Sequence, residues 1–306
     1  MQSLKKIENY ILEEKIGEGS FGQVYKAQHT KTGEHFAIKV IPKSATRNNK
    51  LMRRQLKNET QILGQTRHRN LMHLHKSFET ERNYYLVLDY CPEGDLEKFI
   101  LKNTIKFFSE FEALSIIKQI MNGFQELRRK NVMHRDLKLE NIFIKGQTVV
   151  LGDFGAAKVV RNMTTTTVGT PTNMAPEILK GDDYNHKSDL WSIGIVLYRL
   201  LIGKSPFYAL NIGALKHMAV TKSGKNLDFK GKTHFCEHVK DLLRKLLEPE
   251  PKERISWKDF FNHFVFSDAH KITCGQMISA PNSPQVQRFS VGNPDFNSKS
   301  NISSFL

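Results

Sequence analysis

The chain has 306 residues, 39% hydrophobic and 25% charged, so it can bury a core without disulfide or metal support. Its three cysteines are widely spaced, which excludes a disulfide framework and a zinc site. No apolar run is long enough for a signal peptide or a membrane span, and we therefore expect a soluble, intracellular, cytoplasmic protein. The formal net charge of +15 would suit an acidic partner, but Lys and Arg are scattered and no nucleic-acid-binding fingerprint accompanies them. Nucleic acid is therefore not expected as the main partner.

The first ninety residues are typical of a strand-rich unit with one helix. Short β-prone runs at Gln23–Ala27 and Phe36–Ile41 flank a turn at residues 31–33. Lys50–Leu63 has apolar residues on one helical face, which predicts a helix. The apolar run Tyr84–Leu88 ends in the breaker sequence Cys-Pro-Glu-Gly, which predicts a hinge.

After Gly94 the pattern becomes mainly helical. The clearest predicted helices are Phe111–Lys130, Ser188–Leu201, Gly213–Val220 and Val239–Leu247. From Ser267 the chain is rich in Ser and Asn, has three prolines and lacks periodicity, so residues 267–306 are expected to be a disordered tail or the start of a longer regulatory region. The expected order is a small β-rich lobe, a hinge, a larger helical lobe and a tail.

Two motifs in the first lobe suggest phosphate binding. Gly17, Gly19 and Gly22 lie between β-prone runs and would let the backbone approach phosphates, although a glycine-rich hairpin without a ligand has the same pattern. Lys39 interrupts an apolar strand, and a lysine facing inward is costly unless it is paired. Helical spacing places Glu59 on the inward face of Lys50–Leu63, so Glu59 is the expected partner.

Two motifs in the second lobe indicate phosphoryl transfer. His-Arg-Asp-Leu-Lys-Leu-Glu-Asn at 134–141 is followed by Gly-Asp-Phe-Gly at 152–155, after a short strand. Together they supply a carboxylate to orient a hydroxyl, oxygen ligands for a cation, and a lysine to neutralise charge.

The order of these motifs resembles the eukaryotic protein kinase family over residues 10–266, including Ala-Pro-Glu at 175–177. The resemblance implies an α+β, bilobal fold with an N-lobe at 10–88, a hinge at 89–94 and a C-lobe at 95–266, preceded by an extension at 1–9. It also implies transfer of the γ-phosphate of Mg²⁺-ATP to protein substrates. Lys138 and Thr170 favour the serine/threonine type, and the chain looks most like the autophagy-initiating kinases, with calcium/calmodulin-dependent and mitotic kinases as alternatives.

The resemblance carries roles onto individual residues. Asp136 would be the catalytic base, with Lys138 near the γ-phosphate and Lys39, held by Glu59, on the other phosphates. Asn141 and Asp153 would bind Mg²⁺. Further residues would surround the nucleotide: Ile16, Gly17, Gly19, Gly22, Val24, Ala37, Leu88, Asp89, Cys91 and Phe143. Asp189 would hydrogen-bond the catalytic loop, and Arg254 would pair with Glu177.

Regulation and rival functions also follow from the resemblance. Thr166, three residues before Gly169, has the family's usual spacing for an activating phosphosite, and Arg135 would pair with its phosphate. A pseudokinase scaffold that binds nucleotide without catalysis is the alternative from another class; the complete set of motif residues argues against it. A small-molecule kinase is a third possibility, which Thr170 and residues 175–177 disfavour. The tail is expected to bind regulators, and no oligomeric state is predicted.

Overall fold

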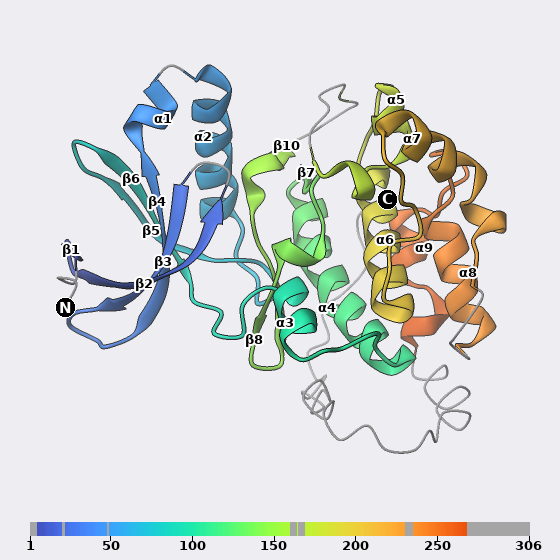
Figure 1. Ribbon diagram of the computed structural model, residues 1–306, viewed down its shortest axis with the longest axis horizontal. Helices are drawn as coiled ribbons and strands as arrows, with labels where there is room; N and C mark the ends of the chain where they lie inside the picture. The colour runs from blue at the N-terminus through green and yellow to red at the C-terminus, as the bar shows by residue number, and fades with distance from the viewer. Residues whose placement is uncertain are drawn as a thin grey trace.

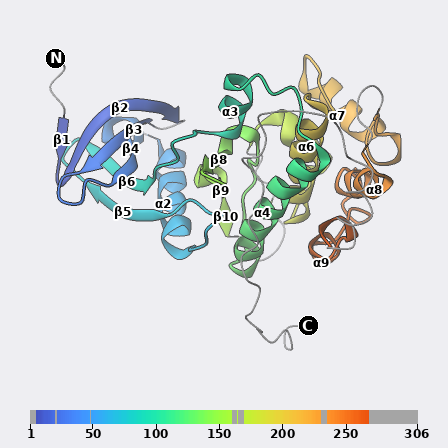
Figure 2. The ribbon, with the colours of Figure 1, turned by 90° about the horizontal axis from the view of Figure 1, so that it is seen from below.

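A computed structural model describes residues 5–19, 22–47, 49–159, 164, 169–229 and 235–267 (Figure 1). Thr166, Cys274 and the predicted tail beyond Ser267 lie outside these residues. The described part forms two lobes, as predicted: a β-sheet with two helices on one side, and a larger, mainly helical region on the other (Figures 1 and 2).

The small lobe is a six-stranded antiparallel sheet with the order β1-β2-β3-β4-β6-β5. Its elements are β1 (Lys5–Ile7), β2 (Tyr10–Gly19), β3 (Gly22–His29), β4 (His35–Pro42), α1 (Lys43–Arg47), α2 (Lys50–Gln65), β5 (Leu74–Glu79) and β6 (Asn83–Asp89). The segment predicted as an N-terminal extension contributes β1, which pairs with β2.

The two faces of this sheet are buried in different clusters because side chains alternate along a strand. Phe36 and Ile38 of β4 belong to a cluster confined to the sheet. Ala37 and Ile41, on the other face, join the core that continues into the large lobe. Lys39 shares the face of Ala37 and Ile41, so it points inward as expected.

Helix α2 covers that inner face. Asn49 caps its N-terminus by accepting a hydrogen bond from the Met52 amide. Its buried residues are Glu59, Ile62 and Leu63, which share one side of the helix. The glutamate predicted to face inward is therefore buried with the apolar stripe.

The large lobe is built around two long helices, α4 and α6. Its helices are α3 (Leu96–Lys102), α4 (Glu110–Arg129), α5 (Pro176–Lys180), α6 (Lys187–Ile202), α7 (Ile212–Thr221), α8 (Glu237–Leu246) and α9 (Trp257–Phe261). Nearly all of α6 is buried, and Trp191 is 0% exposed, so α6 forms the centre of this lobe. No helix among the described residues is long and apolar enough to cross a bilayer.

Short strands at the junction of the lobes position the candidate site. The strands β8 (Ile142–Lys145) and β9 (Thr148–Leu151) form a hairpin, and β7 (Val132–Met133) pairs with β10 (Lys158–Val159). Two 3₁₀ turns flank the hairpin: η1 (Leu139–Asn141) before β8 and η2 (Phe154–Ala156) after β9. Because hairpin strands are antiparallel, Asn141 and Asp153 lie at the same end of it.

Candidate active site

Lys39 and Glu59 form the predicted ion pair between β4 and α2. Lys39 Nζ lies 2.7 Å from Glu59 Oε1 and 2.9 Å from Oε2, and the residues are only 6% and 2% exposed. Burial alone would lower the pKa of Lys39, but the charges of Glu59 and Asp153 outweigh it and raise the pKa. The lysine is therefore held charged beside the start of η2.

Asp136 is the centre of a hydrogen-bond network in the loop between β7 and η1. Its Oδ1 accepts hydrogen bonds from the Thr170 amide and hydroxyl, both at 2.8 Å. Its Oδ2 lies 3.2 Å from Lys138 Nζ and 3.2 Å from Asn141 Nδ2. Lys138 Nζ also donates to Thr170 Oγ1 at 2.9 Å, so Asp136, Lys138 and Thr170 form a closed triangle.

These contacts keep the carboxylate of Asp136 ionised. Burial would raise its pKa, yet the bonds from Thr170 and the charge of Lys138 lower the pKa below the usual range. Asp136 is therefore ionised at neutral pH, and its contacts with Thr170 and Lys138 fix the orientation of its carboxylate.

Asn141 and Asp153 are brought together by the backbone. The Gly152 amide donates to the Asn141 carbonyl at 2.9 Å, which places Asp153 next to Asn141. Asn141 uses its amide nitrogen on the Asp136 carbonyl at 2.8 Å, so the amide oxygen is the atom left for a cation. Asp153 is exposed and has a left-handed backbone, with φ of 51°.

Asp189 of α6 hydrogen-bonds the backbone of the catalytic loop (residues 134–141), as predicted. Its carboxylate accepts the amides of His134 at 3.0 Å and Arg135 at 2.9 Å. The ring of His134 lies 3.1 Å from the Gly152 carbonyl and 5.2 Å from the Phe154 ring centroid. The loop and the Asp-Phe-Gly segment are thus joined through one buried histidine.

The residues predicted around a nucleotide base gather at the junction of the lobes. Three of them, Ala37, Leu88 and Cys91, belong to one buried hydrophobic cluster, and Ile16, Val24 and Phe143 pack against it. Burial raises the pKa of the Cys91 thiol to about 12, so Cys91 is a neutral, apolar wall residue and not a nucleophile.

The glycine motif forms the end of the β2–β3 hairpin. Gly17 pairs with Val24, and Gly19 with Gly22. A Cβ on Gly22 would lie 2.1 Å from the Val40 carbonyl oxygen, so no other residue fits beside β4. The hairpin expected as one alternative is therefore present, and the presence of phosphate beneath it remains a prediction.

The structural pair Arg254–Glu177 is also present. Arg254 Nη1 and Nη2 lie 2.7 Å and 2.8 Å from the two carboxylate oxygens of Glu177, and both side chains are buried. This bidentate pair ties the segment before α9 to the start of α5.

Sequence reasoning missed several polar contacts near the site. The bonds from Thr170 to Asp136, and the contacts of the Asp89 side chain with His75 and Lys145, have no periodic signal in the sequence. It also missed that the charges of Arg135 and Arg54 both act on Lys158.

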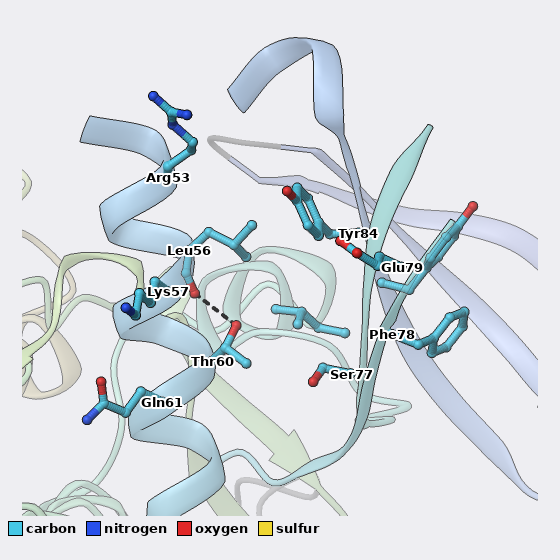
Figure 3. Close-up of a pocket in the computed structure, with 11 residues that line it drawn as sticks. Arg53, Leu56, Lys57, Thr60, Gln61, Ser77, Phe78, Glu79 and Tyr84 are labelled. Carbon is cyan, nitrogen blue, oxygen red and sulfur yellow. Dashed lines mark hydrogen bonds between the residues drawn. The ribbon is translucent and has the colours of Figure 1, made fainter. Parts of the chain in front are cut away.

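A groove of about 680 Å³ lies elsewhere, between α2 and the strands β5 and β6 (Figure 3). It is lined by α2 residues such as Arg53 and Leu56 and by β5 and β6, including Tyr84. None of the predicted site residues lines it, so it is not the candidate nucleotide site.

Comparisons with known proteins agree with this geometry. A family profile described as the protein kinase domain matches residues 10–266. The chain is 37% identical to serine/threonine-protein kinase atg1 of Dictyostelium discoideum over 85% of its length and 39% of that relative. It is 34% identical to serine/threonine-protein kinase ATG1a of Arabidopsis thaliana (89% and 44%) and 33% identical to serine/threonine-protein kinase Nek1 of Mus musculus (89% and 23%). The chain thus spans less than half the length of these relatives.

Proposed function

The chain belongs to the protein kinase family, in its serine/threonine branch, and from this premise we propose that it transfers the γ-phosphate of Mg²⁺-ATP to serine and threonine hydroxyls of other proteins. The observation that carries the proposal is the complete polar set around Asp136 together with the buried Lys39–Glu59 pair. We assign this activity to residues 10–266, with a hinge at 89–94.

Asp136 is the proposed catalytic base. Its ionised carboxylate would accept a hydrogen bond from the substrate hydroxyl and orient that oxygen for attack. Lys138, at 3.2 Å from the same carboxylate, would neutralise charge on the transferred phosphate. Thr170 holds both residues in place through its hydroxyl.

The donor set fits Mg²⁺. Asn141 and Asp153 offer one amide oxygen and one carboxylate, and Mg²⁺ commonly takes one or two protein oxygens and completes its shell with phosphates and water. When bound, Mg²⁺ would neutralise phosphate charge. Lys39, charged and fixed by Glu59, would bind the phosphates from the side of the small lobe.

The complete set of polar residues also weighs against the rival function. A pseudokinase scaffold would need no intact pair at Lys39 and Glu59 and no closed network at Asp136, yet both are formed. No observation favours nucleotide binding without catalysis.

The proposed regulation is phosphorylation of Thr166, which lies outside the described residues. Lys158 lies just before this segment, and burial together with the charges of Arg135 and of Arg54 in α2 lowers its pKa. Thr164, the described residue closest to Thr166, lies 3.1 Å from Lys158 Nζ through its hydroxyl. A phosphate in this segment would therefore meet a positive environment.

We place this reaction inside the cell. Cys91 is a buried free thiol, as expected in a reducing compartment. The proposed partners are protein substrates.

The test is phosphate transfer from Mg²⁺-ATP to a generic protein substrate by the loop-phosphorylated chain, with Asp136→Asn as the matched variant. Phosphoserine or phosphothreonine should form with the parent chain and fall by at least about 100-fold with the variant, because general-base removal typically costs 10²–10⁴ in rate. ATP binding without any transfer by the parent would overturn the kinase proposal.

A further inference from the structure

The carboxylate of Asp89 lies where the two lobes meet. Asp89 is the last residue of β6, at the start of the proposed hinge. Its Oδ2 accepts the His73 amide at 3.1 Å, while its Oδ1 lies 3.2 Å from His75 Nε2 and 3.1 Å from Lys145 Nζ. His75 belongs to β5 of the small lobe and Lys145 to β8 of the large lobe, so one side chain contacts both lobes.

Local backbone structure aims His75 at this carboxylate. The β5–β6 register pairs Leu74 with Leu88 but Lys76 with Val87, so His75 is the extra residue of a β-bulge. A bulge re-aims a side chain at the expense of regular pairing. The His75 ring contacts the Phe36 ring at 5.0 Å, and Phe36 is the β4 partner of Asp89. The bulge in β5 and the pairing of β4 with β6 therefore position the His75 ring beside the Asp89 carboxylate.

The backbone of Asp89 is also hydrogen-bonded to His73. The Asp89 amide donates to the His73 carbonyl at 3.2 Å, and the His73 amide donates back to the Asp89 carboxylate. With its amide used in this way, Asp89 would present its carbonyl to a purine. Two residues on, the Cys91 carbonyl accepts the Gly94 amide at 3.0 Å, so Cys91 would offer its amide.

The segment after Asp89 is also attached to β8. The Ile144 amide donates to the Gly94 carbonyl at 2.9 Å, and Asp95 forms a β-bridge with Phe143, a predicted wall of the base site. In both ribbon views the chain between β6 and α3 passes beside β8 (Figures 1 and 2). Lys145, at the end of β8, adds the ionic contact to Asp89.

The charges around Asp89 indicate that its carboxylate orients the neighbouring backbone and adds little to the stability of the fold. Burial would raise the pKa of Asp89, but hydrogen bonds from Lys145 and His75 lower it below the ordinary value. The Asp89 side chain is 19% exposed, whereas that of Lys145 is 52% exposed. Ion pairs with one exposed partner contribute little to stability.

We infer that Asp89 is a positioning residue for the nucleotide: its carboxylate, held by His73, His75 and Lys145, fixes the peptide group that meets the purine. This inference rests on the proposed function. It assigns the residue to nucleotide affinity and not to the phosphoryl-transfer step.

The experiment measures Mg²⁺-ADP binding by calorimetry on the full 306-residue chain, beside KM for ATP and kcat. Asp89→Asn is expected to raise Kd and KM about threefold to tenfold, as a loss of up to about 1.4 kcal/mol would, with kcat changed less than twofold. The matched control is Asp241→Asn, because Asp241 also has a lysine and a histidine as partners, Lys245 at 2.7 Å and His263 at 3.2 Å, but lies in α8. Its Kd should equal that of the parent.

Lys145→Met gives an independent test, because Lys145 is half exposed and its loss should not prevent folding. It should raise Kd by less than Asp89→Asn, and the double variant should be no weaker than Asp89→Asn alone, as expected for two residues that act through one contact. Equal Kd in parent, Asp89→Asn and Lys145→Met would overturn the inference alone. A parent chain with no ADP affinity would overturn the proposed function, and this inference with it.

Discussion

Thr170 shows how a single hydroxyl can set the state of the candidate base. Its Oγ1 lies 2.8 Å from Asp136 Oδ1, and the Thr170 hydrogen bonds are the strongest influence that lowers the pKa of this aspartate. A depressed carboxyl pKa stabilises the fold above the unfolded value of about 3.9, and that stability is lost as the pH falls through the lower folded pKa. The hydroxyl therefore contributes both to orientation and to ionisation.

Thr170→Val should lower kcat by about tenfold, because hydrogen bonds to charged groups are worth about 1.5–3 kcal/mol and one of the two Thr170 bonds remains. It should also raise the pKa of Asp136 and shift the acidic limb of the pH–rate profile to higher pH. The measurement is kcat against pH for the parent, Thr170→Val and the control Thr170→Ser, which keeps the hydroxyl. Superimposable parent and valine profiles would contradict the role given to Thr170.

At the scale of elements, two helix ends allow a controlled comparison. Gly181 ends α5 and Gly203 ends α6, and both have a left-handed backbone, with φ of 79° and 80°. A Cβ on Gly181 meets nothing within 4 Å, whereas a Cβ on Gly203 would lie 2.0 Å from the Lys106 carbonyl oxygen. The two sites share a conformation and differ in their neighbours.

Gly181→Ala should reduce the free energy of unfolding by about 1–2 kcal/mol, the usual cost of a left-handed alanine. Gly203→Ala should cost about 3 kcal/mol or more, since the backbone at Lys106 must also move and backbone strain adds to the conformational cost. Urea titration of both variants checks this. Equal losses of unfolding free energy in the two variants would show that the Lys106 carbonyl does not lie so close to Gly203 in solution.

The elements that sequence reasoning identified are those with a visible period. The stripe in Lys50–Leu63 places Glu59 inward, and this was enough to predict its pairing with Lys39. Short helices such as α3, with seven residues, and α5 and α9, with five each, were not predicted, because fewer than two full turns cannot display a 3.6-residue pattern.

Contacts such as Asp89–Lys145 and Asp136–Thr170 join residues 56 and 34 positions apart through loops and strand ends. They depend on how the lobes meet, which no local pattern encodes. The motif residues of the site, with Glu59 and Asp189, could thus be predicted, whereas the contacts of Thr170 with Asp136 and of Lys145 with Asp89 could not.

At the scale of the whole molecule, the large positive charge includes cations from both lobes that act on one another. Among the 46 lysines and arginines, Lys158 of the large lobe feels the charges of Arg135 and of Arg54 in α2, and burial together with these two arginines lowers the pKa of Lys158. The guanidinium of Arg135 donates to two neutral groups, the Ala156 carbonyl at 2.7 Å and the Tyr184 hydroxyl at 3.4 Å. Like charges held together across two lobes are stabilised by an anion, and a phosphate on the loop between Lys158 and Gly169 would supply one.

Phosphate at Thr166 should therefore draw Arg54, and with it α2 and Glu59, towards the large lobe. Arg54→Ala should reduce the activation gained on Thr166 phosphorylation by about fivefold, equivalent to about 1 kcal/mol for one partly exposed ionic contact, and Thr166→Ala should abolish that activation. Arg53→Ala is the matched control, since Arg53 is adjacent in sequence but lines the groove between α2 and the strands β5 and β6, which Arg54 does not line (Figure 3). The measurement is kcat/KM of each chain with and without loop phosphate, at low and high salt, because screening should weaken the effect of Arg54. If Arg53→Ala and Arg54→Ala behave alike, the charge acts through the general field of the protein; if only Arg54→Ala loses activation, the loop phosphate connects the lobes through α2.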